Sequence, residues 1–260
     1  MKERIDLLLV ERRLTDSRTK AQWLIRNGFV LVNDIKVFKP GKRVENTSKI
    51  TLTKEFPYVG RGGLKLEHAI RQFSISIKNK ICVDMGASIG GFTDCLLKHG
   101  AQKVYAIDTA KDLLHPSLTC EKKKKKVIPL LGVDVRQPIS IEDKVDIVTT
   151  DITFASLKSI LPNAKSFIKS NGIIISLVKP LFEMEFHHIS KFKIIQDPEN
   201  LKRILLDLID WCKQNEIYPH GIIKSPLLGK GRSVEFFIIF KNYKSAQDID
   251  YLKELDLLLN

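Results

Sequence analysis

From Lys80 onward, short apolar runs alternate with amphipathic stretches along the chain. The runs have the length and β-branched content of buried strands, and apolar positions recur at helical spacing between them. Strands are expected at residues 81–85, 104–108, 127–131, 145–151, 173–178, 217–223 and 234–240. Helices are expected at residues 91–99, 154–168, 198–214 and 245–260. This alternation predicts an α/β fold with a mainly parallel seven-stranded sheet and helices on both faces.

The first 58 residues have the pattern of a small α+β domain. Helical spacing covers residues 4–13 and 18–27, where Ser17 can cap the second helix and Gly28 can end it. A hairpin is expected at residues 29–37 and a further strand at residues 50–53. One proline and three glycines between residues 55 and 63 indicate a linker before another helix. We therefore expect a basic domain at 1–58, a linker and first helix at 59–79, and an α/β domain at 80–260.

The charge of the chain predicts an anionic partner. It has 43 Lys and Arg against 30 Asp and Glu, a net charge of +13. Residues 1–58 hold 13 of the basic and 7 of the acidic residues, so nearly half of the excess lies in this segment. Nucleic acid and an acidic membrane face are the two classes of partner that such an excess fits.

Other features of the composition exclude several classes of protein. The apolar runs are far shorter than the roughly 20 residues of a membrane helix, and charges stand where a signal peptide would begin its apolar segment. The four cysteines have no CxxC spacing, and the six histidines form no metal-binding pattern. A reducing, cytoplasmic location without a metal site is therefore expected.

The clearest chemical signal is the glycine turn Asp84–Thr93, which ends the first strand of the α/β domain and opens a helix. Gly86, Gly90 and Gly91 permit close approach of the backbone to a ligand, and a helix N-terminus favours an anionic group. The turn matches neither GxGxxG nor a P-loop. Asp108 ends the next strand about 20 residues later, where an acid accepts hydrogen bonds from ribose hydroxyls. The pattern predicts an adenosine-containing ligand.

Polar residues also stand at the ends of the later strands. Asp151 and Lys179 follow the fourth and fifth strands, at the edge where α/β sheets bind ligands. Glu235 lies at the last strand, and Lys65 lies on the helix after the linker. Asp134, after the third strand, has two equally good interpretations: a contact to an adenine amino group or a solvated carboxylate.

With these segments the chain resembles, over essentially its whole length, the TlyA family of ribosomal RNA cytidine 2′-O-methyltransferases, also called hemolysins. Its front part is similar to the RNA-binding domain named after ribosomal protein S-four, through Arg4-Ile5-Asp6, Ser17-Arg18 and Val30-Leu31-Val32-Asn33. The rest is similar to FtsJ/RrmJ-type methyltransferases, which use S-adenosylmethionine. The segments that carry this second similarity are residues 61–66, 84–97, 179–183 and 234–236.

The resemblance implies the site residues. The family's Lys-Asp-Lys-Glu tetrad falls on Lys65, Asp151, Lys179 and Glu235, with Lys179 as base, Asp151 orienting it, and the other two positioning the ribose. Cofactor contacts are expected from Asp84, Gly86, Ser88, Gly90, Gly91, Phe92, Asp108 and Asp134. RNA contacts are expected from Arg4, Ser17, Arg18, Lys20, Arg26 and Arg61. Because the methyl donor carries a sulfonium leaving group, no metal is required.

The chain departs from the family pattern at three places. Ile89 stands where the family usually has Thr, Thr109-Ala110 replaces Val-Gly, and residues 184–195 lack the usual glycines. The last departure leaves the shape of the substrate-side loop open. The short segment before Arg4 is similar to members that modify 23S RNA alone, so 23S RNA is the first expected target and 16S RNA the second.

Three further points stay open. A membrane-lytic protein is an alternative that the name hemolysin implies, but no long cationic amphipathic helix or export signal favours it. An RNA-binding module with an inactive methyltransferase body is another, and the complete tetrad argues against it. For the run Lys122–Lys126, a solvated face is the better interpretation and RNA phosphate contact the other. The sequence leaves the oligomeric state unknown.

Overall fold

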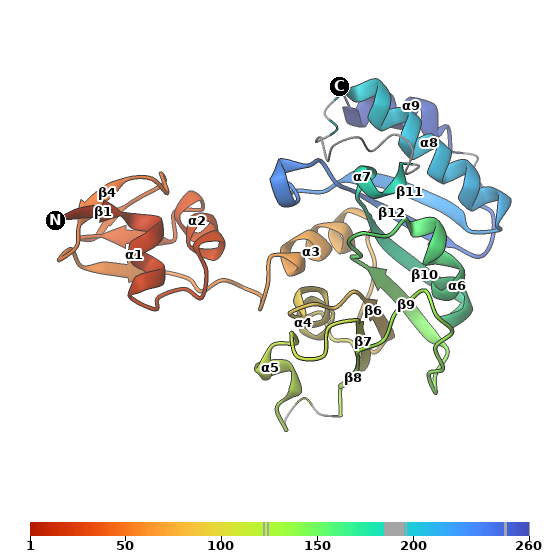
Figure 1. Cartoon of the computed structure of the whole chain (residues 1–260), viewed down its shortest axis with the longest axis horizontal. Coiled ribbons are helices and arrows are strands. Elements are labelled where there is room, and N and C mark those ends of the chain that lie inside the picture. Colours follow the sequence, from red (N-terminus) through yellow and green to blue (C-terminus); the bar gives the residue numbers. More distant parts are fainter. Residues whose placement is uncertain (122, 124, 185–194, 196, 247–248, 260) are drawn as a thin grey trace. The chain divides into compact units, whose positions relative to one another are not determined.

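The structure, a computed structural model, divides the chain into two compact units, Met1–Arg61 and Gly62–Asn260 (Figure 1). It describes residues 1–121, 123, 125–184, 195, 197–246 and 249–259. Within this described part, no helix combines the length and the apolar character needed to cross a membrane.

The first unit consists of two helices and two small antiparallel sheets. Its helices are α1 (Ile5–Glu11) and α2 (Arg18–Arg26), and its strands are β1 (Lys2–Arg4), β2 (Val30–Val32), β3 (Ile35–Lys36), β4 (Arg43–Glu45) and β5 (Ile50–Leu52). β1 pairs with β4, and the other three form a sheet in the order β3-β2-β5. The predicted cap is confirmed, because the Ser17 side chain accepts a hydrogen bond from the Lys20 amide at 3.4 Å. Gly28 has a φ of +71°, as predicted for a helix end.

The second unit is built on the predicted seven-stranded sheet. The strands are β6 (Ile81–Met85), β7 (Lys103–Asp108), β8 (Val127–Leu131), β9 (Val145–Thr150), β10 (Ile168–Val178), β11 (Tyr218–Lys224) and β12 (Phe236–Lys241). Their order is β11-β12-β10-β9-β6-β7-β8, and β12 alone of these seven runs in the opposite direction to the others. The mainly parallel α/β sheet is therefore confirmed.

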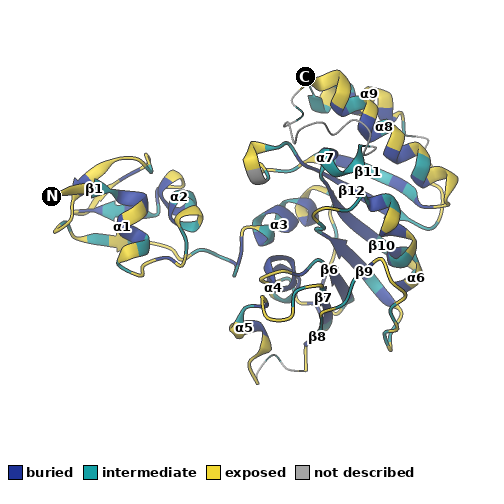
Figure 2. Ribbon diagram, viewed as in Figure 1, coloured by how far each residue is buried: buried dark blue, intermediate teal, exposed yellow. Residues whose placement is uncertain are grey.

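Helices cover both faces of this sheet, with α3 and α4 on one side and α6, α8 and α9 on the other (Figure 1). The helices are α3 (Gly62–Gln72), α4 (Gly91–Lys98), α5 (Pro116–Thr119), α6 (Leu161–Phe167), α7 (Pro180–Glu183), α8 (Pro198–Gln214) and α9 (Tyr251–Leu259). The strands between the two layers are buried, whereas the outer turns of α8 and α9 are exposed (Figure 2).

Two predicted helices are shorter in the structure. The stretch 154–168 is broken into a 3-10 turn, Leu157–Ser159, and α6, because Phe154 has a positive φ and Pro162 favours a new helix start. Helix α9 begins at Tyr251 instead of residue 245. The strands β1 and β4 were not predicted. Each has only three residues, most of them charged, which is too short to show an alternation of apolar and polar residues.

Candidate active site

Three neighbouring strands bring polar residues to one edge of the sheet. β12 pairs antiparallel with β10, and Val178 lies opposite Phe236 at the end of the ladder. Lys179 follows directly on β10 and Glu235 directly precedes β12, so both lie one residue beyond this ladder at the same edge of the sheet. Asp151 follows directly on β9, the other neighbour of β10. The reversed direction of β12 is what places Glu235 at this edge.

The amine of Lys179 is held by three groups of the loop after β9. Its Nζ lies 2.5 Å from Asp151 Oδ1 and donates to the Ile152 carbonyl and to Thr153 Oγ1 at 3.0 Å each. An ammonium group has three N–H donors, so each donor has a partner here. The side chains of Lys179 and Asp151 are mostly but not wholly buried, so the pair remains accessible from solvent.

A second ion pair joins α3 to the residue before β12. Lys65 Nζ lies 2.5 Å from Glu235 Oε2, and the two side chains are only 10% and 3% exposed. Removing one partner of such a buried pair leaves an uncompensated charge, at a cost of about 3–5 kcal/mol. Gly229 packs against this carboxylate, and an added Cβ would meet Glu235 Oε1 and lie 2.6 Å from Ser233 Oγ. The two lysines of the site thus each have a carboxylate of their own.

The glycine turn packs against the backbone beside both ion pairs, at Asp151 and at the start of α3. Gly86 has a φ of +82°, and a Cβ at this position would lie 2.6 Å from the carbonyl oxygen of Asp151. A Cβ on Gly91 would lie 3.3 Å from Gly62 Cα, at the start of the helix that carries Lys65. Two of the glycines are therefore required where the turn meets the residues around the lysines.

Asp84 was expected to contact a cofactor, but its carboxylate is completely buried. It accepts hydrogen bonds from Thr93 Oγ1 at 2.6 Å and from Thr149 Oγ1 at 3.1 Å. Burial raises the pKa of Asp84 to about 7, although the two threonine hydroxyls act in the opposite direction. Through these two hydrogen bonds the Asp84 side chain connects β6 to α4 and β9, and it stabilises the turn from within the core.

The other expected cofactor residues have different surroundings. Asp108 accepts the amide N–H of Ser88 at 2.7 Å and that of Ala110 at 2.8 Å, so it holds the turn and keeps lone pairs for a ligand. Hydrogen bonds from Arg136 lower the pKa of Asp134 to about 2 and occupy both of its oxygens.

Two residues of the turn pack against the protein itself. Phe92 is buried and stacks on Phe237 with 6.1 Å between ring centroids, so it supports the turn from the core. Gly90 has a φ of +90° and packs against Leu118 and Leu114. Ser88 is exposed at the tip of the turn.

In the first unit, Asp6 organises two of the arginines that were expected to bind RNA. Arg4 donates to both of its oxygens at 2.9 and 3.0 Å, Arg18 donates at 2.8 Å, and Gln22 adds a third donor at 2.8 Å. Burial alone would raise the pKa of Asp6, but these hydrogen bonds outweigh it and hold the pKa well below its usual range. The sequence assigned no role to Asp6.

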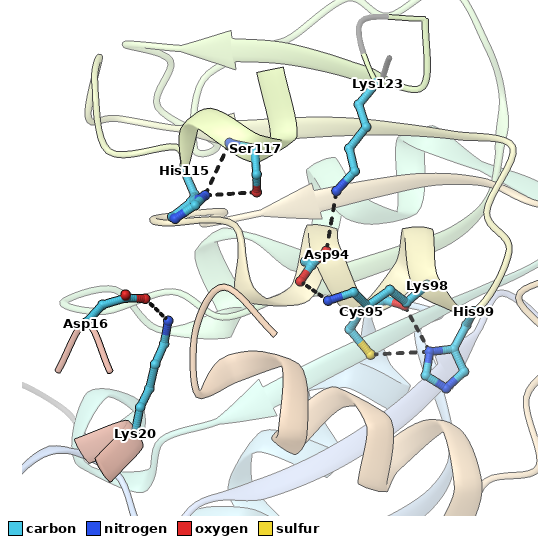
Figure 3. A network of polar contacts seen from close by, with 9 residues as sticks. All are labelled: Asp16, Lys20, Asp94, Cys95, Lys98, His99, His115, Ser117 and Lys123. Atoms are coloured by element: carbon cyan, nitrogen blue, oxygen red, sulfur yellow. Dashed lines mark hydrogen bonds and ion pairs between the residues drawn. The ribbon is translucent and has the colours of Figure 1, made fainter. Parts of the chain in front are cut away.

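The other residues that were expected to bind RNA fall into two groups. Lys20 is paired with Asp16 at 2.6 Å (Figure 3), and the Ser17 side chain is used as the helix cap. Arg26 and Arg61 are exposed and make no hydrogen bond or ion pair with another described residue. Among the residues expected to bind RNA, Arg26 and Arg61 are thus the two whose whole guanidinium group is available without breaking an internal contact.

One lysine of the run 122–126 has an internal partner. Lys123 lies 3.7 Å from the buried carboxylate of Asp94, which also pairs with Lys98 at 2.9 Å (Figure 3). Lys122 and Lys124 lie outside the described residues, as does most of the loop 184–195. Within the described ranges, no group of three or more His, Cys, Asp or Glu side chains could hold a metal ion.

Comparison with known proteins agrees with this arrangement. Residues 58–243 match the FtsJ-like methyltransferase family, and residues 3–48 match the S4 domain. The 16S/23S rRNA (cytidine-2′-O)-methyltransferase TlyA of Mycobacterium tuberculosis is 33% identical over 90% of this chain and 88% of its own length. The chain belongs to the TlyA family of FtsJ-like methyltransferases.

Two further relatives of this methyltransferase carry a different name. Hemolysin A of Brachyspira hyodysenteriae is 34% identical over 91% of this chain and 99% of its own length. A solved structure of a hemolysin-named protein from Streptococcus thermophilus is 28% identical, with a TM-score of 0.72 over 99% of this chain and 94% of that one. The two-part organisation is thus shared with a solved relative over nearly its full length.

Substitution of Asp84 tests the buried carboxylate. Its folded pKa of about 7 means that the folded protein keeps a proton that the unfolded chain releases near pH 4. The free energy of unfolding should therefore fall as pH rises between these values, by about 1.4 kcal/mol per unit of pKa difference. Asp84→Asn should remove this decrease in urea unfolding curves measured from pH 4 to pH 8. An equal slope in both proteins would show that Asp84 does not titrate in this window.

Gly229→Ala tests the packing around the second ion pair. Its Cβ would press on Glu235, so we expect a loss of about 1–3 kcal/mol in the free energy of unfolding. In a Glu235→Ala background the same change should cost less, because the carboxylate that it meets is gone. Leu228→Ala, at the exposed neighbouring position, is the matched control. Additive effects of Gly229→Ala and Glu235→Ala would contradict the assigned contact.

Proposed function

We propose that this chain transfers a methyl group from S-adenosylmethionine to the ribose 2′-hydroxyl of a cytidine in ribosomal RNA. The observation that carries this proposal is the contact between the glycine turn and the Asp151 backbone, since it sets the Lys179–Asp151 pair directly beside the site for a methyl donor. The relative from Mycobacterium tuberculosis, named for this reaction, supports the same substrate. We take 23S RNA as the first target and 16S RNA as the second, in the cytoplasm where ribosomal RNA is found.

The residues at the carboxyl ends of β6 and β7 fit S-adenosylmethionine. The backbone of the turn can follow the ligand closely at Gly86 and Gly90, and Asp108 keeps acceptor capacity for ribose hydroxyls. The N-terminus of α4 favours the carboxylate of an amino acid. When bound, this cofactor supplies a methyl group on a positively charged sulfur that leaves as a neutral thioether.

Lys179 acts as a neutral amine with two N–H groups and a lone pair. It accepts the proton of the ribose hydroxyl at its Nζ and becomes an ammonium, while the hydroxyl oxygen forms its bond to the methyl group and the bond from that methyl group to sulfur breaks. Asp151 and the Ile152 carbonyl can only accept hydrogen bonds, so they fix two N–H groups of the amine and leave the third direction for the reaction. That third direction points to Thr153, the exposed partner, whose place a ribose hydroxyl can take. Holding the oxygen there, in line with the methyl group, removes much of the entropic part of the barrier. The buried pair of Lys65 and Glu235 lies at the same edge of the sheet and positions the ribose.

The first unit supplies affinity for the RNA. It matches an S4 domain, and Asp6 holds two arginines whose remaining N–H groups are exposed and can bind phosphate. Ribosomal RNA, alone or in a ribosomal subunit, is therefore the proposed partner. Because one relative is named Hemolysin A, leakage of dye from liposomes with the purified protein is the control for a lytic activity, and we expect none.

Lys179→Arg is the test of the reaction. Arginine keeps the positive charge but cannot release a proton near neutral pH. In single-turnover assays with 23S or 16S RNA, the wild type should place a methyl group on a cytidine ribose, and the variant should lose this transfer while it binds S-adenosylmethionine normally in calorimetry. A near-normal rate for Lys179→Arg would remove Lys179 as the base and make Lys65 the next candidate.

Asp6→Asn tests the arginine pair. The substitution adds one positive charge, so simple attraction to phosphate predicts tighter RNA binding. If Asp6 orients Arg4 and Arg18, binding should instead weaken by about tenfold, the loss of one charge-assisted hydrogen bond, and the salt dependence should become less steep. Asp34→Asn makes the same charge change at an exposed pair with Lys49 and serves as the control. Tighter binding by both variants would contradict the orienting role.

A further inference from the structure

The short segment that begins with Lys179 is attached to the loop after β9 at two points. At the first, Lys179 holds Asp151, Ile152 and Thr153. At the second, the Glu183 carboxylate accepts Ser156 Oγ at 2.6 Å and the amide N–H of Leu157 at 2.9 Å. The loop 151–157 is therefore tied at both ends to α7 and the residue before it.

Glu183 is a half-buried carboxylate with both oxygens in use. Burial raises the pKa of its carboxyl group, and the hydrogen bonds from Ser156 and Leu157 oppose this. Leu157 begins the 3-10 turn after the loop, so the carboxylate also satisfies an N–H group that has no partner within that turn. Because both carboxylate oxygens bind the loop, we expect any effect of Glu183 on the reaction to pass through the loop.

The loop needs such an attachment because its centre is strained. Phe154 has a φ of +69°, a conformation that bulky residues rarely adopt, and its side chain is 72% exposed. It rests edge-on against Phe182, with 5.5 Å between ring centroids. A backbone held in such a region persists only where the surrounding structure enforces it. The enforcing contacts on either side of Phe154 are those of Lys179 and Glu183.

We propose that Glu183 is a positioning residue for Lys179. By fixing Ser156 and Leu157 it holds the loop 151–157 in place, and with it all three hydrogen-bond partners of the Lys179 amine. The inference rests on the proposed function to the extent that Lys179 is the proton acceptor. It extends that function to a residue outside the tetrad, four positions after the lysine on the same segment.

The test compares two substitutions that differ in hydrogen bonding. Glu183→Gln can still accept from the Leu157 amide and can donate to Ser156 Oγ, so it should keep a kcat close to that of the wild type. Glu183→Ala removes both contacts, and kcat should fall by about 100-fold, as expected when a reacting group is misplaced by about 1 Å. The KM for RNA and the affinity for S-adenosylmethionine should change little in either variant.

The matched control is Asp197→Ala, which removes a carboxylate that accepts the Asn200 amide at the start of α8. It should leave kcat unchanged. Hydrogen exchange gives a readout that does not depend on activity: amides of residues 151–157 should exchange faster in Glu183→Ala and at the wild-type rate in Glu183→Gln. If Glu183→Ala does not fold, Ser156→Ala removes one of the two contacts and should show a smaller loss in kcat with unchanged cofactor affinity.

The outcomes separate this inference from the proposed function. Absence of ribose methylation by the wild-type protein would overturn the proposed function, and the exchange data would still report whether Glu183 holds the loop. A wild-type kcat in Glu183→Ala, or in Ser156→Ala where that variant replaces it, would overturn the positioning role. Equal losses in Glu183→Ala and Glu183→Gln would also overturn it, because the charge and not the hydrogen bonds would then matter.

Discussion

The contact between Gly86 and the Asp151 carbonyl is the constraint on which the site depends. It joins the turn after β6 to the end of β9, and the Asp151 amide donates to the Met85 carbonyl across the same gap at 3.0 Å. Any side chain at position 86 would push these two strand ends apart. Because Lys179 is held by Asp151, a shift of this backbone would move the amine as well. The place of the methyl donor and the place of the base are thus set by one close approach of two backbones.

Much of this fold follows from local patterns, because the strands of the parallel sheet are continuous apolar runs with polar residues at their ends. Helix α8 has the predicted bounds, since Asp197 and Pro198 mark its start and helical spacing continues to Gln214. The stretch 154–168 was predicted as one helix because its apolar positions recur at helical spacing. The conformation of its first residues is instead set by hydrogen bonds with Glu183 and Lys179. These two partners lie more than 20 residues further along the chain, so the pattern within 154–168 does not indicate them.

The sequence indicated which residues lie at the sheet edge, but not what each side chain does there. Asp84 and Phe92 belong to the same signature as Gly86, yet both turn into the core, where they meet Thr149 and Phe237. Their partners come from β9 and β12, and only the register of the sheet brings those strands beside the turn. Residue type and spacing therefore predicted a ligand site. Which residues of the signature face that site and which pack in the core beneath it depends on how the strands pair.

Three carboxylates, the buried Asp6 and Asp84 and the half-buried Glu183, hold segments that carry the proposed chemistry, and the pKa of each depends on its donors. Hydroxyl and amide donors surround Asp84 and Glu183, so burial dominates and raises both pKa values. Asp6 is bound by two guanidinium groups, whose charges outweigh burial and lower its pKa. A carboxylate with several lone pairs can tie together two or three donors from different elements. Neutral donors suffice where the segment must only be held still, whereas charged donors are needed where the carboxylate must present cations to an anionic partner.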